Sequence, residues 1–342
     1  MRVGVRCERP LDLLEVAYRL DGTDGDWMRG LVERMDQLFE TQGLGAGGLF
    51  ATGRIDGEGR TVLAEVPLRH VADRDTGCAR QMAAAMRGYP KNLPADLQAR
   101  TFFSSVTAST ASVVTGFGQM LNDSVSWKHS GVGLLAAKDV LFLTCHEGPL
   151  GSVVLFDALR EIATLKSSEL HLWQRIAAHV GAASRLRRNR AATLAGAEAV
   201  LSPAGQIRHM AAGAVRAEIQ DGFARRRHAR KRDVAPEVAL EVWQGLHDGR
   251  WSLVDYIDTD GKAFVLAVRN EPAHDVASAI SDRQRGAVAL AALGYGNKQI
   301  AYSLGLSAGA VAMLLARARA ATGARTRAEL VARFKRELTS ST

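Results

Sequence analysis

The chain has 342 residues, of which 47% are hydrophobic, and its 44 Lys and Arg residues exceed its 36 Asp and Glu residues, giving a net charge of +8. This length and apolar content exclude a disordered tail and predict two or three globular domains. The basic excess suits a polyanionic partner, and it is concentrated in residues 281–342, where ten basic residues accompany three acidic ones.

No segment approaches 18 consecutive apolar residues, and the N-terminal residues lack the apolar core of a secretion signal. The three cysteines, Cys7, Cys78 and Cys145, show neither zinc-site nor disulfide spacing. We therefore expect a cytoplasmic protein with reduced thiols, no membrane contact, no metal and no cofactor.

Residues 26–40 place apolar side chains at three- and four-residue spacings, which predicts an amphipathic helix. The glycine-rich residues 43–48 follow this helix, and no Lys-Ser or Lys-Thr pair comes after them, so we interpret them as a helix end and a turn, not as a phosphate loop. Five short apolar runs then predict strands of one sheet. The runs are "GLFATGRI", "TVLAEVPL", "GVGLLAAK", "VLFLTCHE" and "GSVVLFDAL".

A long helix is predicted over residues 168–188, with an apolar seam that includes Trp173, Ile176 and Val180. Such a seam can pack against the protein's own sheet or form a dimer contact; we favour packing, with dimerisation elsewhere in the chain. A helix, several strands and a closing helix resemble sensory modules of the GAF or PAS type. We therefore expect an α/β (α+β) sensory domain over residues 1–190, responding to an unknown small-molecule or protein signal.

A smaller α/β domain is expected over residues 191–275. The stretches "AEAVLSPAGQIRHM" and "WSLVDYIDTDGKAFVLAVRN" each predict two strands around a turn, which resembles part of a PAS-type sheet. Between them lies the basic run 224–232, which either binds phosphate or forms a solvated helix face or loop. The sequence favours neither interpretation. Asp255, Asp258 and Asp260 lack the EF-hand spacing, so they predict no metal site.

The C-terminal segment 276–342 is predicted to form an all-α domain of four short helices. Ile300 and Leu304 line one side of a helix, Gly305 permits a turn with positive φ, and Ser307 can cap the helix that follows. These local features predict two helices joined by a tight turn.

This segment resembles the LuxR-type helix-turn-helix family over about residues 279–334. The matching stretches are "SDRQRGAVALAALGYG" for the first helix, "NKQIAYSLGLS" for the second helix and turn, and "TGARTRAELV" for the closing turn and fourth helix, where Thr326 and Glu329 predict a capping box. In the second helix and turn, the matching residues are Asn297, Lys298, Ile300, Ala301, Leu304, Gly305, Leu306 and Ser307. The resemblance implies that the helix beginning at Ala308 enters the major groove with Val311 buried.

The chain departs from the family's pattern in this helix, where Ala310, Ala312, Met313 and Leu314 replace polar side chains, and at Gln284, where Glu is usual and the side chain acts in capping or packing. An apolar surface can contact thymine methyl groups but cannot form bidentate hydrogen bonds with bases. We therefore expect weak direct base readout, with affinity resting on the helix N-terminus and on phosphate contacts from Lys298, Arg317, Arg319, Arg325 and Arg327. The candidate DNA-binding residues are Lys298, Ser307, Ala308, Gly309, Ala312, Met313, Ala316, Arg317, Arg319, Arg325 and Arg327.

The sequence contains no G-x-S-x-G elbow, no Cys/His nucleophile signature and no H-E-x-x-H motif, so no enzymatic activity is predicted. We interpret the chain as a transcriptional regulator that binds double-stranded DNA as a homodimer, with RNA polymerase as a further candidate partner. The alternative is a protein-interaction or adaptor module, in which exposed Met313 and Leu314 dock another protein.

Overall fold

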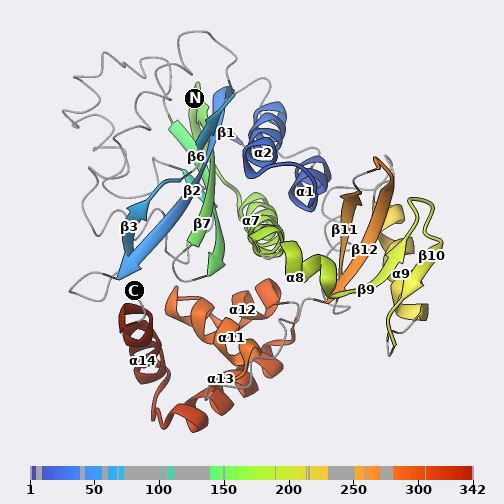
Figure 1. The fold of residues 1–342 in the computed structure, drawn as a ribbon. Coiled ribbons are helices and arrows are strands. Elements are labelled where there is room, and N and C mark those ends of the chain that lie inside the picture. The colour runs from blue at the N-terminus through green and yellow to red at the C-terminus, as the bar shows by residue number, and fades with distance from the viewer. Residues whose placement is uncertain are drawn as a thin grey trace. The chain divides into compact units, whose positions relative to one another are not determined.

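In the computed structural model the chain forms helices and mostly antiparallel sheets, which confirms the predicted mixture of α and β structure (Figure 1). The residues that the structure describes are 2–4, 10–38, 43–55, 61–67, 69–72, 102, 108–110, 139–148, 151–188, 190–212, 214, 216–229, 251–258, 260–269, 280–304 and 306–340. The chain divides into two compact units. The first unit comprises residues 1–17 and 22–181, and the second comprises residues 18–21 and 182–342.

The first unit contains two helices near its N-terminal end, α1 (Pro10–Ala17) and α2 (Asp24–Leu38). The Thr23 hydroxyl accepts a hydrogen bond from the N–H of Asp26 at 3.1 Å, and the Asp26 carboxylate accepts one from the N–H of Thr23 at 3.3 Å. These two reciprocal bonds cap the N-terminus of α2. The buried face of α2 consists of Trp27, Met28, Leu31, Val32 and Met35. This face confirms the predicted amphipathic helix.

A six-stranded sheet is the main element of the first unit, in the order β3-β2-β7-β6-β5, with β4 also paired to β2. Its strands are β2 (Gly43–Ile55), β3 (Thr61–Glu65), β4 (Arg69–Val71), β5 (Ala108–Thr110), β6 (Asp139–Gly148) and β7 (Gly151–Leu159). All of these pairs are antiparallel, and β2 lies beside β7. Four of the predicted strand runs fall in this sheet, and the fifth, 131–138, lies outside the described residues. A separate parallel pair joins β1 (Arg2–Gly4) to β8 (Ile162–Thr164).

The glycine-rich residues 43–48 form the first half of β2, so their interpretation as a helix end and a turn was wrong. At Gly47 a Cβ atom would lie only 2.3 Å from the ring of Phe156. At Gly48 it would lie 2.6 Å from the sulfur atom of Met28 in α2. The glycines are therefore explained by the close approach of a ring and a helix to the strand backbone.

The predicted long helix is α7 (Ser167–Arg188), and the division between the two units falls within it, after Gly181. Its seam residues Trp173, Ile176 and Val180 are fully buried in the single chain, which agrees with the favoured packing role. A short helix, α8 (Arg190–Ala195), follows.

The second unit contains a four-stranded antiparallel sheet in the order β10-β9-β12-β11. Its strands are β9 (Ala197–Leu201), β10 (Ile207–Met210), β11 (Trp251–Ile257) and β12 (Ala263–Arg269), so both predicted hairpins are present. As in the six-stranded sheet, the first strand lies beside the last. In the second hairpin Asp258 holds the turn, because its Oδ1 accepts from the N–H groups of Asp260 and Lys262 at 3.0 and 2.8 Å.

The first part of the basic run 224–232 lies in α9 (Arg216–Ala229). Arg226 is buried and forms an ion pair with Asp255 of β11. Arg225 is exposed and forms an ion pair at 2.7 Å with an aspartate one turn earlier in the helix. The part of the run beyond α9 lies outside the described residues.

Residues 18–21 connect α1 to α2, yet they belong to the second unit. The backbone N–H of Leu20 donates to the carbonyl of Asp255 in β11 at 3.2 Å. Arg187, near the end of α7, donates to the two backbone carbonyls that flank Leu20, at 3.1 and 2.9 Å. These bonds hold the connection against the outer edge of the four-stranded sheet.

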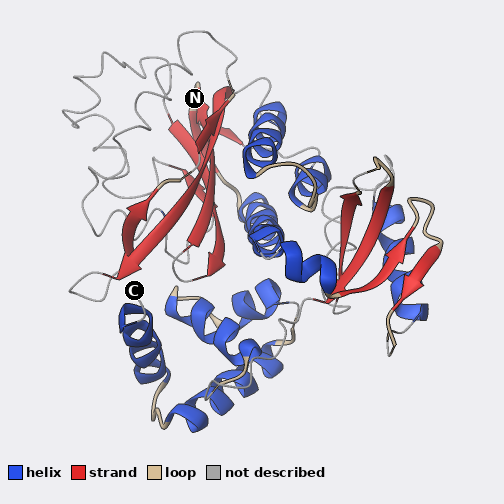
Figure 2. Cartoon of the chain, in the orientation of Figure 1, coloured by secondary structure: helices blue, strands red, loops and turns tan. Residues whose placement is uncertain are grey.

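Four helices lie in the segment where four were predicted (Figure 2). They are α11 (Asp282–Ala292), α12 (Asn297–Leu304), α13 (Ala308–Thr322) and α14 (Arg327–Ser340). Their buried residues include Val288, Leu290, Leu293, Ile300, Val311, Leu315, Leu330 and Phe334. Within the described ranges no single helix is long and apolar enough to cross a membrane. Taken together, α12 and α13 reach the length and apolar composition of a membrane-spanning helix, but the two helices are bent by 101° relative to each other.

Candidate nucleic-acid interface

A complete capping box opens α11. The N–H of Ser281 donates to Oε1 of Gln284 at 2.7 Å, and the N–H of Gln284 donates to Oγ of Ser281 at 3.4 Å. Gln284 therefore performs the capping expected at this position. At its other end α11 is followed by Gly294 with a φ of +89°, and α11 packs against both α13 and α14.

The turn between α12 and α13 is closed by backbone and side-chain hydrogen bonds. The N–H of Leu306 donates to the carbonyl of Ala301 at 2.8 Å. Oγ of Ser307 then accepts from the N–H of Ala310 at 3.1 Å, so the predicted cap of α13 is confirmed. Gly305, for which a positive φ was predicted, lies outside the described residues.

α13 has one buried side and one exposed side. The buried side consists of Val311, Leu315 and Ala318. The exposed side includes Ala308, Gly309, Ala312, Met313 and Ala316, all candidate DNA-binding residues. Met313 has an exposed fraction of 53%. No side chain from position 308 to position 316 carries a nitrogen or oxygen atom, so this half of the helix offers no conventional side-chain hydrogen bond to a base edge.

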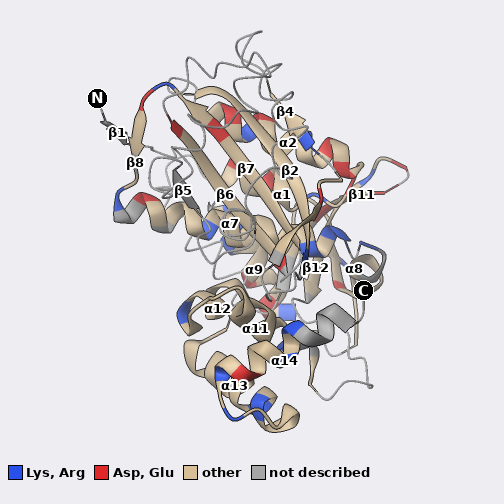
Figure 3. Cartoon of the chain, turned by 90° about the vertical axis from the view of Figure 1, so that its left-hand side faces the viewer, with Lys and Arg blue, Asp and Glu red and all other residues tan. Residues whose placement is uncertain are grey.

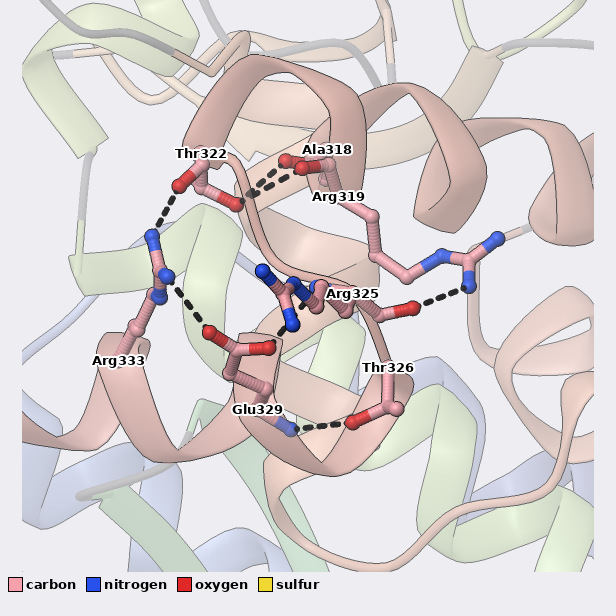
Figure 4. Close-up of polar contacts among 7 residues, drawn as sticks. All are labelled: Ala318, Arg319, Thr322, Arg325, Thr326, Glu329 and Arg333. Atoms are coloured by element: carbon pink, nitrogen blue, oxygen red, sulfur yellow. Dashed lines mark hydrogen bonds and ion pairs between the residues drawn. The ribbon is translucent and has the colours of Figure 1, made fainter.

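Exposed basic residues accompany this apolar surface. Lys298 is exposed in the first turn of α12, Arg317 is exposed in α13, and Arg325 is exposed in the turn before α14. Figure 3 colours Lys and Arg positions along the chain blue. Arg319 is half-buried, and its Nη1 atom donates to the carbonyl of Arg325 at 3.3 Å (Figure 4). Because the whole segment from residue 281 onward carries a net charge of +7, its field favours a polyanion.

A network of polar contacts fixes the corner between α13 and α14 (Figure 4). Arg333 of α14 donates to the carbonyl of Thr322 in α13 and forms an ion pair at 2.6 Å with Glu329. The Glu329 carboxylate also accepts from the N–H of Arg325 at 2.9 Å. Oγ1 of Thr326 accepts from the N–H of Glu329 at 3.1 Å, which is one of the two hydrogen bonds of the predicted capping box. The Glu329 carboxylate therefore interacts with Arg333 and with the backbone of Arg325, both within this corner.

Arg327 has a different environment from the exposed arginines. Its Nη1 donates to Oδ1 of Asn297 at 2.8 Å, and its Nη2 donates to the carbonyl of Tyr295. Arg327 therefore braces the start of α14 against the start of α12. Sequence reasoning grouped it with the phosphate-contacting arginines and missed this role, because the bonded partners lie 30 and 32 residues away. Apart from half-buried Arg319 and Arg327, every candidate DNA-binding residue is exposed.

In the part of the chain that the structure describes, the remaining titratable residues provide no second candidate site. Among the residues that the structure describes, no group of three or more His, Cys, Asp or Glu side chains could hold a metal ion. Cys145 of β6 is a free thiol that is fully buried, and burial raises its pKa, so the reactive thiolate is disfavoured. Cys7 and Cys78 lie outside the described residues.

No protein-family model matches the chain, and no curated protein is significantly similar to it. Function must therefore be inferred from the residues themselves.

Proposed function

We propose that the chain is a DNA-binding transcriptional regulator whose segment 276–342 is a LuxR-type helix-turn-helix domain. The main support for this proposal is the structure of α13, which has a capped N-terminus and an exposed face of small side chains. Small side chains allow the helix backbone to approach base edges in the major groove. The neighbouring basic side chains supply the contacts to phosphate that position such a helix.

Phosphate contacts dominate the affinity in this proposal. Lys298, Arg317, Arg319 and Arg325 bind phosphates, whereas Arg327 braces the start of α14 against the start of α12. Each neutralised phosphate releases counterions, so affinity falls steeply as the salt concentration rises.

The upstream residues act as sensory modules, with a GAF-like domain over 1–190 and a PAS-like domain over 191–275. Two antiparallel sheets, each with its first strand beside its last, support this assignment. The regulator works as a cytoplasmic homodimer, because paired half-sites add affinity and specificity to a small DNA-binding unit. A small-molecule or protein signal changes how the two C-terminal domains are presented to DNA, and RNA polymerase is a further partner.

A second candidate function is a protein-interaction module that retains the helices but does not bind DNA specifically. The exposure of Met313 and the partial exposure of Leu314 favour it, because exposed apolar side chains on one helix face can mark a protein contact.

The decisive experiment measures binding of the full-length chain to labelled random-sequence duplexes between about 50 and 200 mM salt. We expect tight binding at low salt and a steep loss across this range. The double variant Arg317→Ala/Arg325→Ala should reduce the slope of log affinity against log salt by about 2, one unit for each lost phosphate contact.

The matched control is Arg208→Ala/Lys262→Ala, which removes two exposed positive charges from the hairpins of the four-stranded sheet. Its salt slope should equal that of the unmodified protein. Absence of DNA binding would contradict the proposed function and favour the protein-interaction module. Binding with an unchanged slope in the Arg317/Arg325 variant would contradict the assignment of the phosphate contacts.

A further inference from the structure

We infer that α13 recognises A·T-rich DNA through the C5-methyl groups of thymine. Met313 is the residue that distinguishes thymine from bases without this methyl group. This inference rests on the proposed DNA-binding function and deepens it by naming the chemical feature of the DNA that the helix recognises.

The polar side chains at the two ends of α13, Ser307 and Thr322, form hydrogen bonds with the backbone of the helix. Oγ of Ser307 accepts from the N–H of Ala310, and Oγ1 of Thr322 donates to the carbonyl of Ala318 at 2.8 Å. Between these ends, the first polar side chain is Arg317, which lies in the second half of the helix. A recognition helix contacts base edges mainly with its N-terminal residues. Direct readout by this half of α13 therefore cannot use side-chain hydrogen bonds.

An apolar helix surface in the major groove can distinguish base pairs by the apolar groups that they present there. Among the groups that base pairs present there, the apolar one is the methyl group of thymine, while the others are hydrogen-bond donors and acceptors. Met313 is the long apolar side chain on the exposed side, with 53% of its surface open to solvent. Its unbranched, polarisable thioether adapts to a small apolar contact. The alanine methyl groups at 312 and 316 widen the same surface.

Gly309 adds an independent observation. A Cβ atom at this position would meet a single neighbouring atom, Oγ of Ser307, at the comfortable distance of 3.9 Å. The described structure therefore does not need glycine here for its own packing, unlike Gly47 and Gly48 of β2. A glycine on an exposed face with room around it favours the close approach of another molecule to the first turn of α13.

Charge and side-chain size together favour a duplex over a protein as the occupant of this face. Exposed Lys298, Arg317 and Arg325 complement a phosphate backbone. Protein-docking surfaces are anchored by large side chains such as Trp, Tyr and Arg in desolvated pockets. In the described part of the four helices, Met313 is the one large hydrophobic side chain that is exposed, and alanines and a glycine surround it.

Replacement of thymidine by deoxyuridine tests the inference, because it removes the methyl group and leaves every hydrogen-bonding group of the base in place. The full-length chain is titrated, at one salt concentration, with a duplex of alternating A·T pairs and with the same duplex containing deoxyuridine. We expect the thymidine duplex to bind more tightly by about fourfold for each methyl group contacted. A G·C duplex should gain affinity when its cytosines carry a C5-methyl group.

Two variants separate methyl recognition from phosphate binding. Met313→Ala should bring the ratio of the two affinities toward one, because the long apolar side chain is lost. Arg317→Ala should weaken binding to both duplexes equally and leave the ratio unchanged.

Equal affinity for the thymidine and deoxyuridine duplexes, with salt-dependent binding intact, would overturn the inference and leave the proposed function standing. A full thymidine preference in Met313→Ala would overturn the assignment to Met313. Failure to bind any duplex would overturn both the inference and the proposed function, and the face would then be examined for a protein partner.

Discussion

Arginine is abundant in α9 and in the C-terminal helices, and Arg225 and Arg226 of α9 have different environments from Arg317 and Arg325 of the C-terminal helices. In α9, Arg226 is buried against Asp255 and Arg225 is paired with an aspartate on the same helix. In the C-terminal helices, Arg317 and Arg325 are exposed, and within the described residues no ion pair binds their guanidinium groups. The two regions look alike as basic sequence, and only burial and pairing distinguish structural charge from charge that is open to a partner.

The largest expected effect follows removal of the buried charge in α9. Arg226→Met keeps much of the side-chain volume but leaves Asp255 without this partner. We expect a local loss of about 3 kcal/mol, at the low end for a broken buried pair, because the Asp255 side chain is 32% exposed. Hydrogen–deuterium exchange of α9 and β11 in the full-length chain measures this loss locally, which suits a chain of several domains.

The double variant Arg226→Met/Asp255→Leu is the matched control, because it removes both charges and should recover part of the lost protection. Unchanged exchange in the single variant would contradict a structural role for Arg226, since Arg226 would then contribute no more than a surface residue.

An intermediate effect is expected at Arg327, the one candidate DNA-binding arginine that braces two helices. Arg327→Ala loses two hydrogen bonds from a charged donor and should cost about 2 kcal/mol. Faster exchange at the first turns of α12 and α14 would report this loss, and Asn297→Ala should reproduce part of it. The salt slope of DNA binding, measured where the variant is folded, should stay unchanged. A slope reduced by about one would instead place Arg327 on a phosphate.

The smallest effects are expected at the exposed arginines. Arg225→Ala should change stability by no more than about 0.5 kcal/mol, because both partners of its ion pair are more than half exposed. Arg317→Ala should be equally neutral for stability while weakening DNA binding. Thermal melting of the two variants beside the unmodified protein measures the first point. A destabilisation above about 1 kcal/mol in either variant would show that an exposed arginine in this chain also has a structural role.

Local rules were sufficient to predict the cap of α13, because Ser307 caps the helix through a residue three positions away. The burial of Val311 was implied by the resemblance to the LuxR-type family, and helical periodicity then indicates which residues lie on the opposite, exposed side. The hairpins of the four-stranded sheet were predictable for the same reason, because Asp258 and Gly261 determine the turn within a few residues.

Contacts between distant segments were not predictable. The role of Gly47 depends on the ring of Phe156, which follows more than a hundred residues later, and the same glycines read locally as a turn. The brace formed by Arg327 likewise needs the folded positions of Tyr295 and Asn297. An arginine in a basic segment carries no local signal that separates a brace from a phosphate contact.

The attachment of residues 18–21 to the second unit limits how the protein can be dissected. A fragment that starts at Ala182 would contain the rest of the second unit but would lack this connection. The β11 edge at Asp255 would then lose its hydrogen bond from Leu20, and Arg187 would lose both of its carbonyl acceptors. An opened strand edge pairs readily with other chains, so such a fragment would be prone to aggregate. Separation of the two units therefore requires a graft that supplies the missing four residues as well as a cut in the chain.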